Sequence, residues 1–272
     1  MSALSGCTIV MSGGSRGIGL AIAVAAARVG ANVTLLAKTD TPNPRLPGTI
    51  HTAAAEIEAA GGQALAIVGD VRDEQSVQRA VDATVERFGG IDIVVNNASA
   101  IDVSRTEVLS VKKFDLMQHI QLRGTFLLTR AAIPHLRESD NAHILSLSPP
   151  LNLSAKWLGA HPGYTVAKYG MSLLTLGWAE DFRAEGIAAN TLWPETMIAT
   201  AAVKNLLGGD TAIGTSRQPE IVADAAIAIL TSPARANTAH SYIDVEVLAA
   251  AGITDLARYG GSENLTRDIF VD

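Results

Sequence analysis

Tyr164 and Lys168 are the residues whose types and spacing best suit chemistry. They begin and end the stretch YTVAK, and Tyr164 is the only one of the four tyrosines with a lysine four residues later. Residues four apart share one face of a helix, and a nearby ammonium group lowers the pKa of a tyrosine by favouring phenolate. Tyr164 is therefore a candidate to give a proton to a carbonyl or to take one from an alcohol. Without further context, such a pair is more often a chance neighbour on a solvated helix.

A second candidate site is the glycine-rich stretch SGGSRGIG at 12–19, between a predicted strand and a predicted helix. Glycine permits a tight turn and lets the backbone approach a pyrophosphate, which then faces the N-terminus of the helix. The alternative is an ordinary strand–helix turn, but the position after the first strand favours a dinucleotide site. The residues predicted to line this site are Ser12, Gly13, Gly14, Ser15, Arg16, Gly17, Ile18 and Gly19.

The end of the second predicted strand bears on the choice of cofactor. NAD enzymes commonly place an acidic residue there to bind the ribose 2′-hydroxyl, whereas this chain has Ala37. Lys38 follows, and Arg16 lies in the glycine-rich stretch, so two cations are available for a 2′-phosphate. The alternatives are that both cations are solvated surface charges and that Asp40 supplies the missing carboxylate. The prediction is NADP, with NAD as the weaker alternative.

These candidate sites need a framework, and the pattern of the chain predicts one. Short apolar runs alternate with alanine-rich stretches of helical period. The predicted strands are 7–12, 32–37, 64–70, 91–97, 143–148 and 187–193. Strands that are apolar throughout are covered on both faces, and strand–helix alternation produces a parallel sheet with right-handed crossovers. The prediction is an α/β fold with a doubly wound parallel sheet, of Rossmann type, in a single domain over 1–272, with a proline-rich loop at 39–48.

Composition narrows the classes of function. Hydrophobic residues make up 48% of the 272 residues and charged residues 18%, which indicates a folded chain with a sizeable core. The net charge of −6, without a block of lysine and arginine, argues against nucleic acid or an anionic membrane as a partner. Cys7 is the only cysteine, and the histidines have no metal-ligand spacing. We expect a cytoplasmic protein without a metal site or a membrane span.

The order and spacing of the motifs resemble the short-chain dehydrogenase/reductase family from residue 5 to about 245. The matching motifs are SGGSRGIG, Asp70 and Val71 after the third strand, NNAS at 96–99, YTVAK, and Pro194 after the sixth strand. The resemblance implies that Asp70 and Val71 lie near the adenine, that Asn97 supports the cofactor cleft and that Lys168 binds the nicotinamide ribose. It also implies cofactor contacts for Tyr164 and Met197, and a homotetramer or homodimer.

The chain departs from the family pattern in the stretch QLRG. The family usually carries an asparagine three residues before a glycine there, and this asparagine holds a water that links the lysine to solvent. Gln121 occupies that place, ahead of Gly124. Glutamine keeps the amide but adds one methylene, so the expectation is a relay that is displaced rather than lost, with Gln121 among the catalytic residues. A second departure is Glu195, which follows Pro194 where the family usually has glycine.

The largest departure is in HILSLSPP at 143–150. Alignment with the family places Pro149, which has no hydroxyl, where the catalytic serine usually stands, and Ser148 one position earlier. A proline pair ends a strand and bends the chain, which would turn the Ser148 hydroxyl toward Tyr164. The alternative keeps Ser148 as a strand-end hydroxyl bonded to backbone. SPPLNL, with the stretch 37–62, resembles the hydroxysteroid dehydrogenase-like protein 2 subgroup of the family, which favours a catalytic Ser148.

The substrate is the least specified feature. Residues of about 195–216 have the position of the family's substrate lid, and about 246–272 form a C-terminal tail. The apolar side chains expected to face the substrate are Met197, Ile198, Val203, Leu206, Leu207 and Trp157. We therefore expect an NADP(H)-dependent oxidoreductase that transfers hydride between nicotinamide and a small hydrophobic carbonyl or alcohol. The alternative is a nucleotide-binding scaffold or regulatory protein with weak or no turnover.

Overall fold

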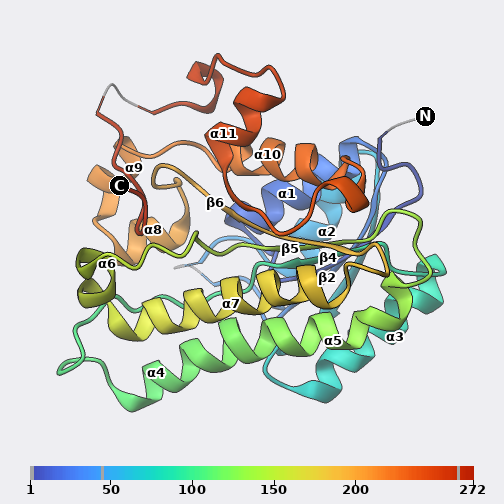
Figure 1. The fold of residues 1–272 in the computed structure, drawn as a ribbon, viewed down its shortest axis with the longest axis horizontal. Coiled ribbons are helices and arrows are strands. Elements are labelled where there is room, and N and C mark those ends of the chain that lie inside the picture. Colours follow the sequence, from blue (N-terminus) through green and yellow to red (C-terminus); the bar gives the residue numbers. More distant parts are fainter. Residues whose placement is uncertain (1–2, 44–45, 262–263) are drawn as a thin grey trace.

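A seven-stranded parallel sheet forms the centre of the computed structural model, which describes residues 3–43, 46–261 and 264–272 (Figure 1). The strand order is β3-β2-β1-β4-β5-β6-β7. The strands are β1 (Thr8–Ser12), β2 (Asn32–Ala37), β3 (Gln63–Val68), β4 (Ile93–Asn96), β5 (His143–Ser146), β6 (Ala188–Trp193) and β7 (Ser241–Ile243). The predicted doubly wound, Rossmann-type sheet is confirmed. Pro44 and Arg45 of the predicted loop 39–48 lie outside the described residues.

Helices cover both faces of the sheet (Figure 1). One layer contains α1 (Gly17–Arg28), α2 (Ile50–Ala59), α10 (Glu220–Leu230) and α11 (Asp244–Ala250). The other contains α3 (Glu74–Phe88), α4 (Val111–Met117), the π-helix η1 (Gln118–Arg123), α5 (Gly124–Leu136) and α7 (Pro162–Asp181). The shorter helices are α6 (Ala155–Ala160), α8 (Ala201–Leu206), α9 (Gly209–Gly214), η2 (Ala234–Ala236) and η3 (Ala257–Tyr259).

Alternate residues of β1 show why a continuously apolar strand is needed. Ile9 and Met11 pack into the core beneath α1 and α10, whereas Val10 packs into the core beneath α3 and α5. All three side chains are fully buried, since successive side chains of a strand point to opposite faces. Burial of each such side chain contributes roughly 1.5–3 kcal/mol. The central strands are therefore fixed in register by two cores at once.

Local signals in the sequence fix the ends of the helices. The Asp73 carboxylate accepts a hydrogen bond from the Ser76 backbone N–H at 3.0 Å and caps the start of α3. Gly89 ends that helix with a left-handed φ of 91°. The helix α3 therefore begins at an aspartate cap and ends at a glycine, both of which are sequence signals. The sequence prediction did not include β7, because its three residues, SYI, form no apolar run.

The strand order reverses between β1 and β4, which is the place where sheets of this type bind ligands. The glycine-rich turn follows β1 and the NNAS motif follows β4, so both lie at this switch point. Residues 266–272, called the closing segment here, return to the same end of the sheet. Arg267 forms an antiparallel bridge with Thr196, just after β6. The fold thus brings the two sequence motifs and the end of the chain together.

Within the described ranges, no helix is long and apolar enough to cross a membrane. The same part of the chain contains no group of three or more histidine, cysteine, aspartate or glutamate side chains placed to hold a metal ion.

Candidate active site

The glycine-rich turn after β1 is packed directly against Asn97. A β-carbon added at Gly13 would lie 2.6 Å from the Asn97 Nδ2 atom, and one at Gly19 would lie 2.4 Å from the same atom. Asn97 Nδ2 also donates a hydrogen bond to the Ser12 carbonyl at 3.2 Å, and the Ser12 hydroxyl accepts from the Asn97 backbone N–H at 3.2 Å. Glycine is therefore required at both positions, and Asn97 is packed against the turn and hydrogen-bonded to it.

The start of α1 fits the pyrophosphate of a dinucleotide. The first turn, residues 17–20, carries only glycine and apolar side chains. Gly13 and Gly14 hold φ values of 79° and 95°, which direct the turn around the start of the helix. Free N–H groups at a helix N-terminus attract anions, and the absence of side chains on the glycines leaves the backbone accessible. Ser12, Ser15 and Ile18 belong to the same turn, and together these residues fit the phosphates of a nicotinamide dinucleotide.

Lys38 and Arg16, the two cations predicted to bind a 2′-phosphate, have different partners in the structure. Lys38 lies 3.1 Å from Asp70 and its side chain is 61% exposed, so it can reach a ligand. Arg16 Nη2 donates to the Gly48 carbonyl at 2.8 Å and Arg16 Nε donates to the Pro47 carbonyl at 3.1 Å. Arg16 thus holds the 39–48 loop against the glycine-rich turn, and this contact was not predicted from the sequence.

Asp70 occupies the end of β3 in a strongly cationic setting. Its carboxylate accepts hydrogen bonds from Arg72 at 2.6–3.0 Å, which, with Lys38 nearby, hold the pKa of Asp70 far below its usual value. Val71 beside it is buried against Gly124, where an added β-carbon would lie 3.0 Å from the valine methyl groups. The structure therefore brings Asp70, Val71 and Lys38 to one edge of the cleft beside the glycine-rich turn.

Tyr164 and Lys168 lie one turn apart on α7, and each has only 3% of its surface exposed. The Lys168 Nζ atom donates to the Leu147 carbonyl at 2.7 Å and lies 5.1 Å from the centre of the Trp193 ring. Burial lowers the pKa of Lys168 to about 7, opposed by the charge of Asp268. The predicted pair is thus a buried pair that faces the carboxyl end of the sheet.

The surroundings of Tyr164 raise its pKa, which contradicts the lowered value expected from Lys168. Burial is the largest cause, and the charge of Asp268 adds to it. A hydrogen bond with the Ser99 side chain acts in the opposite direction. Desolvation of the phenolate outweighs the other effects, because the closing segment covers the ring. Tyr164 therefore keeps its proton at neutral pH in this arrangement.

Ser148 is placed away from the position expected of the catalytic serine. Its hydroxyl is fully buried and accepts a hydrogen bond from the Ser172 hydroxyl at 3.1 Å. Ser172 lies two helical turns beyond Tyr164 on α7, a rise of roughly 12 Å. Ser172 also donates to the Pro149 carbonyl at 2.6 Å. The structure thus brings Ser148 to Ser172 and the Pro149 carbonyl, whereas Ser99, an exposed residue, interacts with the Tyr164 hydroxyl.

Gln121 lies in η1 and contacts the loop that carries Ser99 rather than Lys168. Its amide, with the nitrogen turned toward the backbone, donates to the Ala100 carbonyl at 2.8 Å and to the Met117 carbonyl at 3.3 Å. The side chain is fully buried. A π-helical turn inserts an extra residue and redirects side chains, and such turns are frequent at functional sites. Gln121 therefore fixes the residue next to Ser99.

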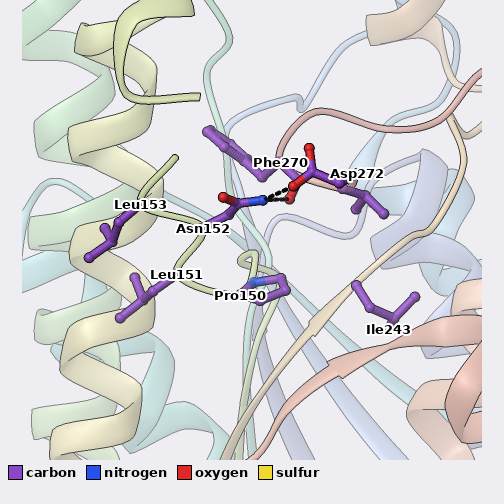
Figure 2. A pocket seen from close by; sticks show the side chains of 8 residues that line it. Pro150, Leu151, Asn152, Leu153, Ile243, Phe270 and Asp272 are labelled. Atoms are coloured by element: carbon purple, nitrogen blue, oxygen red, sulfur yellow. Dashed lines mark hydrogen bonds between the residues drawn. The ribbon is translucent and has the colours of Figure 1, made fainter. Parts of the chain in front are cut away.

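The lid and the closing segment cover the site as one unit. Met197 donates its backbone N–H to the Thr266 carbonyl at 2.9 Å, and Asp268 donates its N–H to the Glu195 carbonyl at 2.9 Å. Ile198 and Val203 of the lid are buried, whereas Leu206 is 57% exposed. Beside the closing segment lies a cavity of about 450 Å³, in which Asn152 is hydrogen-bonded to Asp272 (Figure 2).

Three residues of the site were not predicted from the sequence: Ser99, Asp268 and Phe270. Ser99 belongs to the NNAS motif, for which the resemblance implied only support of the cofactor cleft. Its place in that motif is the sequence signal that could have pointed to it. Asp268 is half-buried, and desolvation raises its pKa to about 7. Phe270 is 1% exposed and stacks on Tyr164, with ring centroids 6.1 Å apart. Asp268 and Phe270 lie about a hundred residues after Tyr164 in the chain, and no local sequence pattern indicates such a long-range contact.

The fold agrees with comparisons to known proteins. A family model described as short chain dehydrogenase matches residues 7–209. The chain belongs to the short-chain dehydrogenase family. Hydroxysteroid dehydrogenase-like protein 2 of Danio rerio is 54% identical over 271 residues, covering 99% of this chain and 65% of that protein. The human protein of that name is 49% identical and covers 99% of this chain and 64% of its own length.

These relatives confirm the subgroup resemblance, and the chain spans slightly less than two thirds of their length. Solved structures agree over nearly the whole chain. A putative dehydrogenase of Xanthomonas campestris has a TM-score of 0.95 and 53% identity, with 99% of each chain covered. A short chain dehydrogenase of Mycobacterium thermoresistibile has a TM-score of 0.93 and 55% identity, covering 99% of this chain and 96% of the other. The match to these two structures therefore extends over nearly the whole chain.

Proposed function

We propose that this member of the short-chain dehydrogenase family is an NADP(H)-dependent oxidoreductase that acts on a hydrophobic carbonyl or alcohol. The observation that carries the proposal is the buried Tyr164–Lys168 pair, with the Ser99 hydroxyl at Tyr164, at the end of the sheet that carries the glycine-rich turn. The residues proposed to hold the cofactor are Ser12, Gly13, Gly14, Ser15, Arg16, Gly17, Ile18, Gly19, Lys38, Asp70, Val71, Asn97, Tyr164, Lys168 and Met197.

The proposed chemistry divides hydride and proton between cofactor and protein. Reduced nicotinamide, when bound, supplies a hydride to the carbonyl carbon. Tyr164 is protonated at neutral pH, as a general acid must be, and donates its phenolic proton to the carbonyl oxygen. Ser99 orients the same oxygen in place of the family's usual serine. Lys168 binds the nicotinamide ribose with an ammonium group that the Leu147 carbonyl already positions. In the reverse direction, the phenolate form of Tyr164, which the forward transfer leaves behind, takes the proton from an alcohol.

The preference for NADP(H) rests on the charges around Lys38. The Asp70 carboxylate beside Lys38 is neutralised by Arg72, so the local potential is positive. A 2′-phosphate carries charge that a lysine stabilises, whereas a ribose hydroxyl gains little from it. Arg16 contributes through the 39–48 loop that it holds in place.

A hydrophobic substrate is supported by the aromatic rings near Tyr164. Trp157, Tyr169, Trp193 and Phe270 form an aromatic cluster with it. Apolar pockets with a few polar groups are typical of sites for small apolar ligands. Within that cluster, Tyr164 is the residue whose hydroxyl reaches the Ser99 side chain. The substrate carbonyl is therefore proposed to bind between these two hydroxyls.

A homodimer or homotetramer is the proposed assembly. Phe126 on α5 and Val166 and Leu173 on α7 are 42%, 54% and 59% exposed, respectively. The two helices are long neighbours on the same side of the sheet (Figure 1). Apolar side chains on such a face support association with a second copy.

Replacement of the proton donor tests the function. Tyr164→Phe removes one hydroxyl and keeps the stacked ring, so the fold is expected to stay unchanged and NADPH is expected to bind through its remaining contacts. We expect kcat for apolar ketones with NADPH to fall by about 10²- to 10⁴-fold, as for loss of a general acid. Turnover is measured by NADPH absorbance. Equal turnover in the wild type and the variant would contradict the role of Tyr164, whereas no turnover in a wild type that binds NADPH would favour a nucleotide-binding scaffold.

A pair of serine variants tests which hydroxyl acts on the substrate. We expect Ser99→Ala to lower kcat by about 10- to 1000-fold, because a positioned donor at the reacting oxygen is lost. Ser148→Ala is the matched control and should stay within about threefold, since Ser172 still donates to the Pro149 carbonyl. Steady-state kinetics on one ketone compare the two. The reverse ranking would assign the role to Ser148, as HILSLSPP suggested.

Charge reversal at Lys38 tests the cofactor preference. Lys38→Asp should raise the Kd of NADPH by roughly tenfold or more at moderate salt while NADH is spared, because the 2′-phosphate would meet a like charge. Fluorescence titration gives both constants. Lys112→Asp, an exposed charge reversal on α4, serves as the control. The NADP(H) assignment fails if the wild type binds NADH as tightly as NADPH.

A further inference from the structure

The closing segment, residues 266–272, is held over the catalytic pair by backbone contacts. The Trp193 indole N–H donates to the Ile269 carbonyl at 2.8 Å. The Asp268 N–H donates to the Glu195 carbonyl, next to Pro194, at 2.9 Å. These bonds attach the segment to the end of β6, where the substrate lid begins. The segment is therefore part of the active-site wall.

Phe270 is the side chain that this segment presents to Tyr164. The two rings are nearly parallel, with an interplanar angle of 14° and centroids 6.1 Å apart. Tyr169, Trp157 and Trp193 surround the same phenylalanine at centroid distances of 5.0, 5.8 and 6.3 Å, respectively. Four aromatic contacts and 1% exposure fix the ring in one place.

The backbone at Phe270 is in a conformation that a side chain disfavours. Its φ is 75°, in the left-handed region where glycine is the usual residue. A bulky residue is retained there only when its surroundings hold it, and such conformations concentrate at functional sites. The outer end of the segment supplies one fixed point. The Asp272 carboxylate accepts from Asn152 Nδ2 at 2.7 Å and from the Trp157 indole N–H at 3.0 Å, and Lys156 lies 3.2 Å away.

The two sides of Phe270 differ. The phenylalanine ring lies over Tyr164, which is almost fully covered, so a substrate can reach the tyrosine hydroxyl only past this ring. Phe270 also lines the cavity of about 450 Å³, which is open to solvent and bordered by Pro150, Leu151 and Ile243 (Figure 2). An extended apolar chain is narrow enough to pass beside a ring and enter that cavity. A wide, branched group next to the carbonyl would collide with the ring.

We propose that Phe270 determines substrate specificity, by admitting carbonyl compounds that carry an unbranched apolar chain and excluding those that are bulky beside the reacting carbon. This inference rests on the proposed function, because it places the reacting carbonyl at Tyr164. It adds a residue of the closing segment to the substrate site and gives that site a shape.

The test compares 2-decanone, which has an unbranched chain, with 1-adamantyl methyl ketone, which is bulky beside the carbonyl. The wild type is expected to prefer 2-decanone in kcat/KM. Phe270→Ala should lower that preference at least about tenfold, since removal of a ring opens the approach to Tyr164. Phe270→Leu keeps most of the apolar volume and should lower it by about threefold. Phe88→Ala is the matched control, at the end of α3, and should leave the preference unchanged.

Two further measurements keep the result decisive. Thermal unfolding and NADPH titration establish that each variant is folded. If Phe270→Ala does not fold, the substrate preference of Phe270→Leu alone tests the inference. Binding of both ketones, in the presence of NADP⁺, is followed through the fluorescence of Trp157 and Trp193 beside Phe270. If the wild type binds the ketones selectively without turning them over, the proposed function fails while the specificity inference stands. An unchanged preference in folded Phe270→Leu and Phe270→Ala, in both kinetics and binding, would overturn the inference.

Discussion

The hydrogen bond between the Lys168 ammonium group and the Leu147 carbonyl is the interaction on which the active site depends. A buried ammonium is costly unless it is paired and hydrogen-bonded, and burial alone lowers its pKa. The carbonyl is available because the β5 ladder ends at Ser146, one residue earlier. Pro149 and Pro150 prevent the strand from continuing, and the Pro149 carbonyl accepts from Ser172 on α7. The unusual SPP stretch therefore fixes the end of β5 against the helix that carries Tyr164 and Lys168.

Asp268 completes the electrostatic balance of this buried group. Burial raises the pKa of Asp268 to about 7, while the charge of Lys168 acts in the opposite direction. Each group favours the ionised form of the other. The same closing segment places Phe270 on Tyr164, so the groups that set the charge of the lysine and the protonation of the tyrosine arrive together. A neutral tyrosine beside a lysine held for ribose is the arrangement required of a proton donor.

Much of the framework could be predicted because it depends on local signals. The continuous apolar strands, the Asp73 cap and the Gly89 stop of α3, and the glycines against Asn97 all leave a pattern in the sequence. The site was less predictable because its contacts are made between distant segments. Ser148 and Ser99 are both serines at strand ends, and only the packing of α7 on the sheet shows which one reaches Tyr164. The prediction of a lowered pKa for Tyr164 was wrong, because nothing in the YTVAK motif indicates that the closing segment covers the ring.

The central claim is that the closing segment buries the Tyr164 side chain and thereby raises its pKa. The most direct measurement is an NMR titration of protein labelled at the tyrosine ζ-carbon, with the Tyr164 resonance assigned by its loss in Tyr164→Phe. We predict that Tyr164 titrates above the ordinary tyrosine pKa of about 10, and that its pKa decreases in Phe270→Ala. Titration of Tyr164 in the wild type at or below about pH 10 would contradict the account.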